Sequence, residues 1–275
     1  MDNVTHSLIG AAIGQTGLKK LSGLGMPPLV ISAPIPAVDA ACTLYGMASL
    51  AMRRGLTHGP LAMALLPIML VAAMVGFDRW QAARGTRPAD RAPVRPLPLY
   101  LLALLGTISH PAFDWLNSYG VRLLEPFAPT WFYGDTLFII DAALLALLIG
   151  GWFWTRRAER AGGRWAQRGR VVVALIAAYV AGNGIISARA VAWGHSAYIT
   201  AYNRPADLVV ASPVPLLFWR RDVLWRGGGQ HGQLPYSAMG NGGAAGELAM
   251  GAQPIAMASP ATAATLAAMA RDDAG

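Results

Sequence analysis

The chain has 275 residues, of which 55% are hydrophobic and only 13% are charged. A soluble domain usually carries about 25% charged residues, so the composition argues against an ordinary soluble domain and indicates that lipid is the main solvent. The single cysteine, Cys42, excludes an intrachain disulfide. The net charge of +8 would suit nucleic acid, but the placement of the arginines is explained better by membrane orientation, and we expect no nucleic-acid partner.

The first segment predicts a short helix that runs to about residue 18, because Asp2 or Asn3 can cap its start. Gly10 and two further glycines would lie close together on it, a pattern that is typical of helices in close contact. Residues 21–52 carry four prolines and one charge, Asp39. Since proline interrupts a helix, we expect a broken or re-entrant segment there, with Asp39 either in a site or capping a helix.

Four later segments are long and apolar enough to cross a bilayer. They are residues 60–77, 97–113, 136–155 and 171–188. A helix needs about 20 mostly apolar residues to cross roughly 30 Å of hydrocarbon. The sequence therefore predicts an all-α, polytopic bundle of transmembrane helices with four clear spans, the short N-terminal helix and the broken segment.

The C-terminal third of the sequence contains fewer patterns that predict structure. We divide the chain into a transmembrane domain at residues 1–193, a small extramembrane segment at 194–226 that has strand-like apolar runs, and a flexible tail rich in glycine and alanine at 227–275. His195 and His231 lie in this part of the chain, and we expect both to be surface histidines.

Arginine placement predicts the orientation of the bundle. The connections at residues 79–95 and 156–170 are rich in arginine, whereas residues 111–134 carry one cation, Arg122. Short cytoplasmic loops collect Lys and Arg, so the two arginine-rich connections should be cytoplasmic in an inner, or plasma, membrane. A set of polar residues then falls on the non-cytoplasmic face: His6, His58, His110, Asp114 and Asp135.

Imidazole and carboxylate groups at one depth indicate either a metal site or a proton relay. His110 and Asp114 are four residues apart and share a helix face. Pro111 suggests that the helix restarts there. Asp135 fits a helix cap. We expect Asp141 to lie about 9 Å deeper and to meet His6, His58 or Arg54.

Five segments in order resemble the YdjM-like family of inner-membrane metal-dependent hydrolases, over about residues 1–225. They are Met1-Asp2-Asn3-Val4-Thr5-His6-Ser7, Pro36-Ala37-Val38-Asp39, Arg53-Arg54-Gly55-Leu56-Thr57-His58, the stretch from Gly106-Thr107-Ile108-Ser109-His110 through Asp114 to Leu124, and Gly134-Asp135 through Asp141.

The family is distantly similar to zinc-dependent phospholipase C. The resemblance implies a membrane-bound hydrolase that uses a divalent metal, zinc in the first instance, on a phosphoester or lipid-like substrate. It implies five metal ligands: His6, Asp39, His58, His110 and Asp114. Asp39 is also assigned as the catalytic residue. Supporting or structural roles around these ligands fall to Arg54, Thr57, Asp135 and Asp141.

Two departures from the family pattern keep an alternative open. Ala37 stands where the pattern has its first Asp, and Arg53 stands where it has His. Both changes remove a metal ligand, so the alternative is a non-catalytic membrane protein with a degenerate site. A proton-coupled transporter is the third reading. The metal hypothesis requires His58 to lie within about 12 Å of the His110/Asp114 pair, the reach of a binuclear centre.

Overall fold

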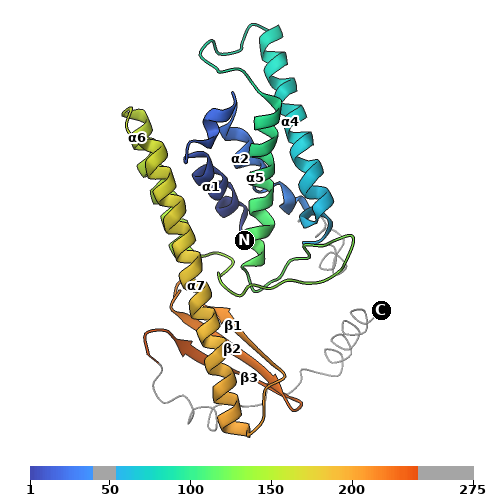
Figure 1. Cartoon of the computed structure of the whole chain (residues 1–275), viewed down its shortest axis with the longest axis vertical. Coiled ribbons are helices and arrows are strands. Elements are labelled where there is room, and N and C mark those ends of the chain that lie inside the picture. Colours follow the sequence, from blue (N-terminus) through green and yellow to red (C-terminus); the bar gives the residue numbers. More distant parts are fainter. Residues whose placement is uncertain (40–53, 241–275) are drawn as a thin grey trace. The chain divides into compact units, whose positions relative to one another are not determined.

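The structure is a computed structural model that describes residues 1–39 and 54–240. It divides into two compact units, Met1–Gly184 and a second unit that begins at Ile185. The first unit is built from helices, and the second contains a three-stranded antiparallel sheet (Figure 1). The predicted helical membrane fold is therefore confirmed in its main part, whereas the all-α class is wrong for the second unit.

Helix α1 (Asn3–Gly14) packs against the short helix α2 (Met26–Ser32), and the turn η1 (Leu18–Leu21) connects them. Asp2 caps α1 and accepts a hydrogen bond of 2.9 Å from the backbone N–H of Thr5. A Cβ atom at Gly10 would overlap the carbonyl group of Leu29, so the backbones of α1 and α2 touch only because residue 10 is glycine. In α2, prolines occupy the first turn, where no N–H partner is lost.

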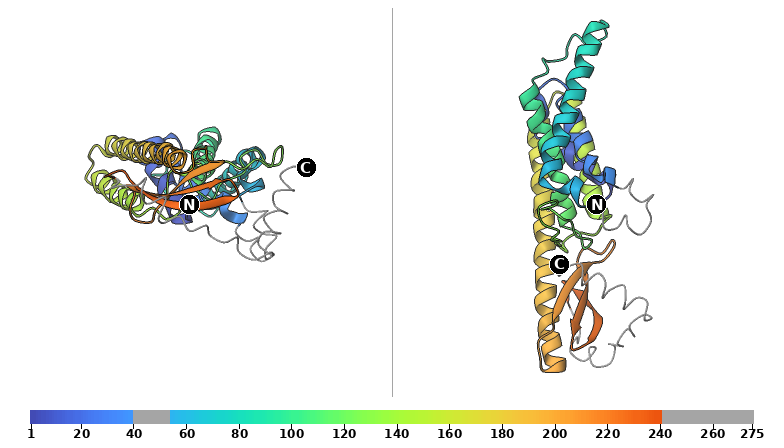
Figure 2. Two further views of the ribbon diagram at one scale, coloured as in Figure 1. Left: turned by 90° about the horizontal axis from the view of Figure 1, so that it is seen from below. Right: turned by 90° about the vertical axis from the view of Figure 1, so that its right-hand side faces the viewer.

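Helices α4 (Pro60–Ala83) and α5 (Pro96–Trp115) lie side by side (Figures 1 and 2). Their shared core contains Val71, Met74, Leu99 and Ala103. The predicted restart at Pro111 is wrong, because α5 continues through that residue to Trp115. Proline inside a membrane helix is tolerated where neighbouring groups compensate for the missing N–H.

Three described helices are long and apolar enough to span a membrane: α4, α5 and α7 (Trp165–Tyr202). The fourth predicted span, at 136–155, is wrong. Its helix, α6 (Ala142–Arg160), begins six residues later than predicted and ends in the charged residues 156–160. Its uncharged part, residues 142–155, extends about 21 Å at 1.5 Å per residue, which is less than the roughly 30 Å of hydrocarbon.

An ion-pair network joins α6 to η1. Lys19 Nζ lies 2.5 Å from Glu159 Oε1, and Arg156 Nη1 lies 2.8 Å from Glu159 Oε2. Burial alone would raise the pKa of Glu159, but the hydrogen bonds from Lys19, Arg156 and Gln15, together with the charge of Lys19, lower it below its ordinary value. The positive residues of both segments are thus held together at one end of the unit.

The second unit packs the C-terminal part of α7 against strands β1 (Leu208–Pro213), β2 (Arg220–Gly227) and β3 (Gln230–Ser237), as Figures 1 and 2 show. Buried and exposed residues alternate along the strands, as expected for a sheet with one covered face. Gly228 and Gly229, which we predicted to be flexible, both have positive φ and form the β2–β3 turn. Strand β3 therefore lies inside the segment expected to be a tail.

Candidate metal centre

Three side chains from α1 and α5 meet in a buried cluster. His6, His110 and Asp114 each expose at most 3% of their surface, and their donor atoms lie within 4.8 Å of one another. The ring of His6 stacks on that of His110 with 3.8 Å between centroids. His6 Nε2 lies 3.3 Å from Asp114 Oδ1, and His110 Nε2 lies 3.5 Å from Asp114 Oδ2. The predicted helical spacing of His110 and Asp114 thus places both on the face that meets α1.

The turn η3 (Leu56–His58) adds a third imidazole to this cluster. His58 Nε2 lies 3.3 Å from Asp114 Oδ2, and its ring centroid lies 4.9 Å from that of His110. The convergence that the sequence required is therefore confirmed, at a distance far below 12 Å. A Cβ atom at Gly59, directly after His58, would overlap the carbonyl of Glu125, so glycine is needed to bring this turn close to the next loop.

Hydrogen bonds behind His58 determine which nitrogen of its ring carries the proton. Thr57 Oγ1 donates to Asp39 Oδ2 at 3.0 Å, so its single hydrogen is used there. The same Oγ1 lies 2.9 Å from His58 Nδ1 and can therefore only accept from it. In the neutral ring the proton is then on Nδ1, and the lone pair is on Nε2, facing Asp114.

A backbone carbonyl orients His110 in the same way. His110 Nδ1 lies 2.6 Å from the carbonyl oxygen of Ala33, just after α2. A carbonyl only accepts, so Nδ1 must donate, and the neutral ring carries its lone pair on Nε2. Metal-binding histidines are usually held by such a bond from the other ring nitrogen.

This arrangement fits a cation. Nε2 of His58 and of His110 both face Asp114 Oδ2, and either a proton on one of these rings or a cation beside them would offset the repulsion between their lone pairs and the carboxylate. His6 Nδ1 and Nε2 have no hydrogen-bond partner among the described residues, although both atoms are buried. The amino group of Met1 also pairs with Asp114 Oδ1. Imidazole nitrogen and carboxylate oxygen are ligands that zinc prefers.

A sequence model of the YdjM inner membrane protein family matches residues 1–191. That is more than half of the 275-residue chain. The chain belongs to the YdjM inner membrane protein family. Neither the curated proteins nor the solved structures contain a match. Family membership and the three apolar helices together identify a membrane protein.

In this YdjM family member, Asp39 lies behind His58 rather than among the three clustered donors. Its Oδ2 accepts from the backbone N–H of Arg54 at 2.6 Å and lies 3.5 Å from His58 Nδ1. Arg54 adopts positive φ, and its Nη1 donates to the carbonyl of Gly120. Ala37 is described and carries no ligand atom, while Arg53 lies outside the described residues.

The two other predicted acidic residues take different places from those expected. Asp135 is no helix cap: it has positive φ and lies in the loop before α6, where burial raises its pKa. Asp141 is the cap of α6 and accepts from the backbone N–H of Leu144 at 2.9 Å. Its side-chain partner is Tyr179, at 2.8 Å, instead of His6, His58 or Arg54. The expected depth was wrong because residues 135–141 are not helical.

Sequence reasoning missed the carbonyl of Ala33 and the hydroxyl of Tyr179. A backbone carbonyl leaves no signal in residue identity, because every residue has one. Tyr179 occurs within an apolar run, where a hydroxyl-bearing ring usually indicates a local hydrogen-bond partner. That signal could have directed attention to a buried acceptor such as Asp141.

Proposed function

We propose that this protein is a membrane-bound, metal-dependent hydrolase and that His6, His110 and Asp114 hold its divalent cation. One observation carries the proposal: the donor atoms of His6, His110 and Asp114 lie within 4.8 Å of one another in a buried cluster. Two histidines and one carboxylate leave a position open for water, as in catalytic zinc sites. When bound, the cation would lower the pKa of water and so supply a nucleophile at neutral pH.

The protein's own residues then have separate tasks. We assign His58 Nε2 as the acceptor of the proton that the attacking water loses, because the Thr57 hydroxyl keeps the proton of the ring on Nδ1. Asp39 holds that hydroxyl in place and, through it, stabilises the imidazolium that forms. Asp39 is then a positioning residue, and it no longer needs to be a ligand.

The arginine-rich connection between α4 and α5, at residues 79–95, supports a site at the opposite end of these two helices, which we propose is the non-cytoplasmic face of the inner membrane. A phosphoester is the substrate class we propose, since an attacking hydroxide and a nearby cation suit its developing negative charge. Asp141 is hydrogen-bonded to Tyr179 and to the first turn of α6, so it takes no part in this site, which weighs against a proton relay through it.

Elemental analysis of the full-length protein, purified in detergent, tests the cation site. We expect stoichiometric zinc or manganese in the wild type, its loss in His110→Ala, and its retention in the matched control His195→Ala in the second unit. His58→Ala should keep the metal and lose hydrolysis of bis-p-nitrophenyl phosphate.

Each other outcome has a distinct meaning. Wild type without metal would support the non-catalytic alternative that Ala37 and Arg53 suggest. Loss of metal in His58→Ala would make His58 a ligand instead of a proton acceptor. Iron in place of zinc would overturn the metal assignment, and loss of hydrolysis of bis-p-nitrophenyl phosphate in that protein would then favour the oxygen chemistry that two histidines and a carboxylate also support.

A further inference from the structure

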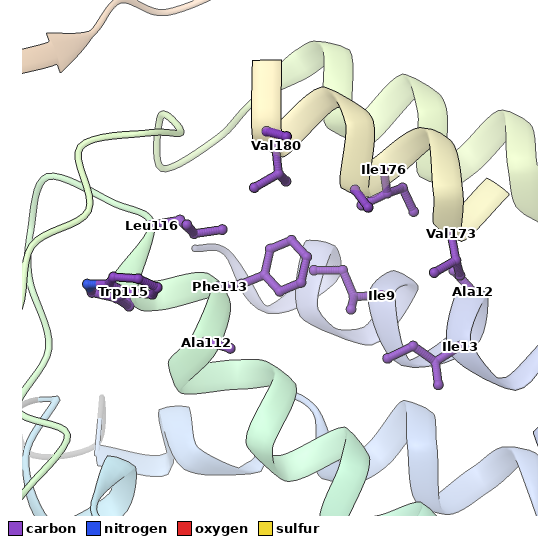
Figure 3. A pocket seen from close by; sticks show the side chains of 12 residues that line it. Ile9, Ala12, Ile13, Ala112, Phe113, Trp115, Leu116, Val173, Ile176 and Val180 are labelled. Atoms are coloured by element: carbon purple, nitrogen blue, oxygen red, sulfur yellow. The ribbon is translucent and has the colours of Figure 1, made fainter. Parts of the chain in front are cut away.

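An apolar pocket lies on the same two helices, α1 and α5, that carry His6, His110 and Asp114. It has a volume of about 470 Å³ and lies between α1, the end of α5 and residues 173–181 of α7. Figure 3 shows Ile9 and Phe113 facing Ile176 and Val180 across it. All twelve lining residues are Ala, Ile, Val, Leu, Phe or Trp, so no charged side chain lines the space.

The pocket and the metal centre share two helices. On α1, Ile9 follows His6 by three residues, about 4.5 Å along the helix axis. On α5, Phe113 directly precedes Asp114, about 1.5 Å along the axis. The two sites therefore lie at nearly the same depth, on adjoining faces of the same helices.

The lining determines what can fill the space. Water is held in a cavity by two to four polar partners, and these side chains offer almost none. The surrounding helices belong to a membrane protein, so hydrocarbon chains are the apolar molecules at hand. The volume is within the range of about 300–1,000 Å³ that ligand sites have.

We infer that this pocket binds an acyl chain of the substrate, which is therefore a phospholipid whose phosphoester lies beside His6 and Asp114. The inference rests on the proposed function and adds a substrate class to it. A chain anchored at Ile9 and Phe113 would leave the headgroup at the cluster one helical turn away. Binding of the acyl chain then positions the phosphoester at the cluster, and a water-soluble phosphodiester lacks this positioning.

Photo-crosslinking in detergent, with a phosphatidylglycerol that carries a diazirine in its acyl chain, tests the inference. We expect mass spectrometry to place the label on residues 9–13 and 173–181. Ala177→Phe fills the pocket from an exposed lining position. It should reduce this label about tenfold, the loss expected when roughly two methylene groups are kept out. Ala73→Phe, on an exposed position of α4 outside the pocket, is the matched control and should label like wild type.

The pocket inference fails if the label spreads evenly over all apolar helices or if Ala177→Phe leaves it unchanged. His110→Ala separates this test from that of the proposed function, because it should lose metal and keep the pocket label. A hydrolase that binds metal but labels evenly would overturn only the lipid pocket. A labelled pocket in a protein without metal would overturn only the hydrolase.

Discussion

Replacing Thr57 with valine should disturb the proposed metal centre without removing any of its proposed ligands. The substitution keeps the shape of the side chain but deletes the hydroxyl that joins Asp39 to His58. His58 exposes 2% of its surface, so its Nδ1–H would be left buried without its partner. A buried donor without a partner costs about 1–3 kcal/mol.

The structure indicates the lower end of that range. Asp39 Oδ2 lies 3.5 Å from His58 Nδ1, and a small shift would let the carboxylate accept directly. We therefore expect Thr57→Val to lower the free energy of unfolding by about 1 kcal/mol, which corresponds to about 2–4 °C in Tm for a chain of this size. Hydrolysis should fall about 10–100-fold, as it does when a supporting bond behind a functional histidine is lost.

Thermal unfolding in detergent and initial rates with bis-p-nitrophenyl phosphate provide the two measurements. Thr57→Ser keeps the hydroxyl and should behave like wild type in both measurements. The metal content should stay stoichiometric in Thr57→Ser and in Thr57→Val. The reasoning about the proton on Nδ1 is refuted if valine and serine behave alike. It is also refuted if Thr57→Val retains the full rate.

Three further substitutions test the surroundings of the site. Gly10→Ala should destabilise the first unit by more than 1 kcal/mol in chemical unfolding, because its Cβ would overlap a carbonyl of α2, whereas Gly150→Ala on an open helix face should be neutral or slightly stabilising. Asp141→Ala should cost about 0.5–2 kcal/mol through loss of the α6 cap, with metal content unchanged in elemental analysis. Glu159 has a lowered pKa in the folded chain, so its ionised carboxylate stabilises the fold at pH values above its ordinary pKa of 4.5. This stabilisation is lost as the pH falls through the pKa of the folded state. Glu159→Gln should flatten that acid dependence in Tm-versus-pH curves, and an unchanged slope would show that the pair with Lys19 contributes nothing.

The sequence predicted the site better than the span count, for a physical reason. The spacing of His110 and Asp114 needs only helical periodicity, and the approach of His6 and His58 to them agrees with the prediction that all four residues lie at the same ends of their segments. Span counting failed at residues 136–155 because hydropathy does not register that residues 135–141 are non-helical. The strand β3 was missed because a Gly-Gly pair suits a flexible tail and a tight hairpin turn equally well.

The departures at Ala37 and Arg53 bear on how many cations the proposed metal centre could hold. Each of the three imidazoles in the cluster approaches the same carboxylate, that of Asp114. Asp39, the one remaining acidic group of its segment, already accepts from Arg54 and Thr57 through Oδ2. The described residues therefore provide one set of donors around one point and no second carboxylate to bridge two ions. For the proposed metal centre we therefore expect a single cation per chain, and the two departures from the family pattern would be changes that a one-cation centre tolerates.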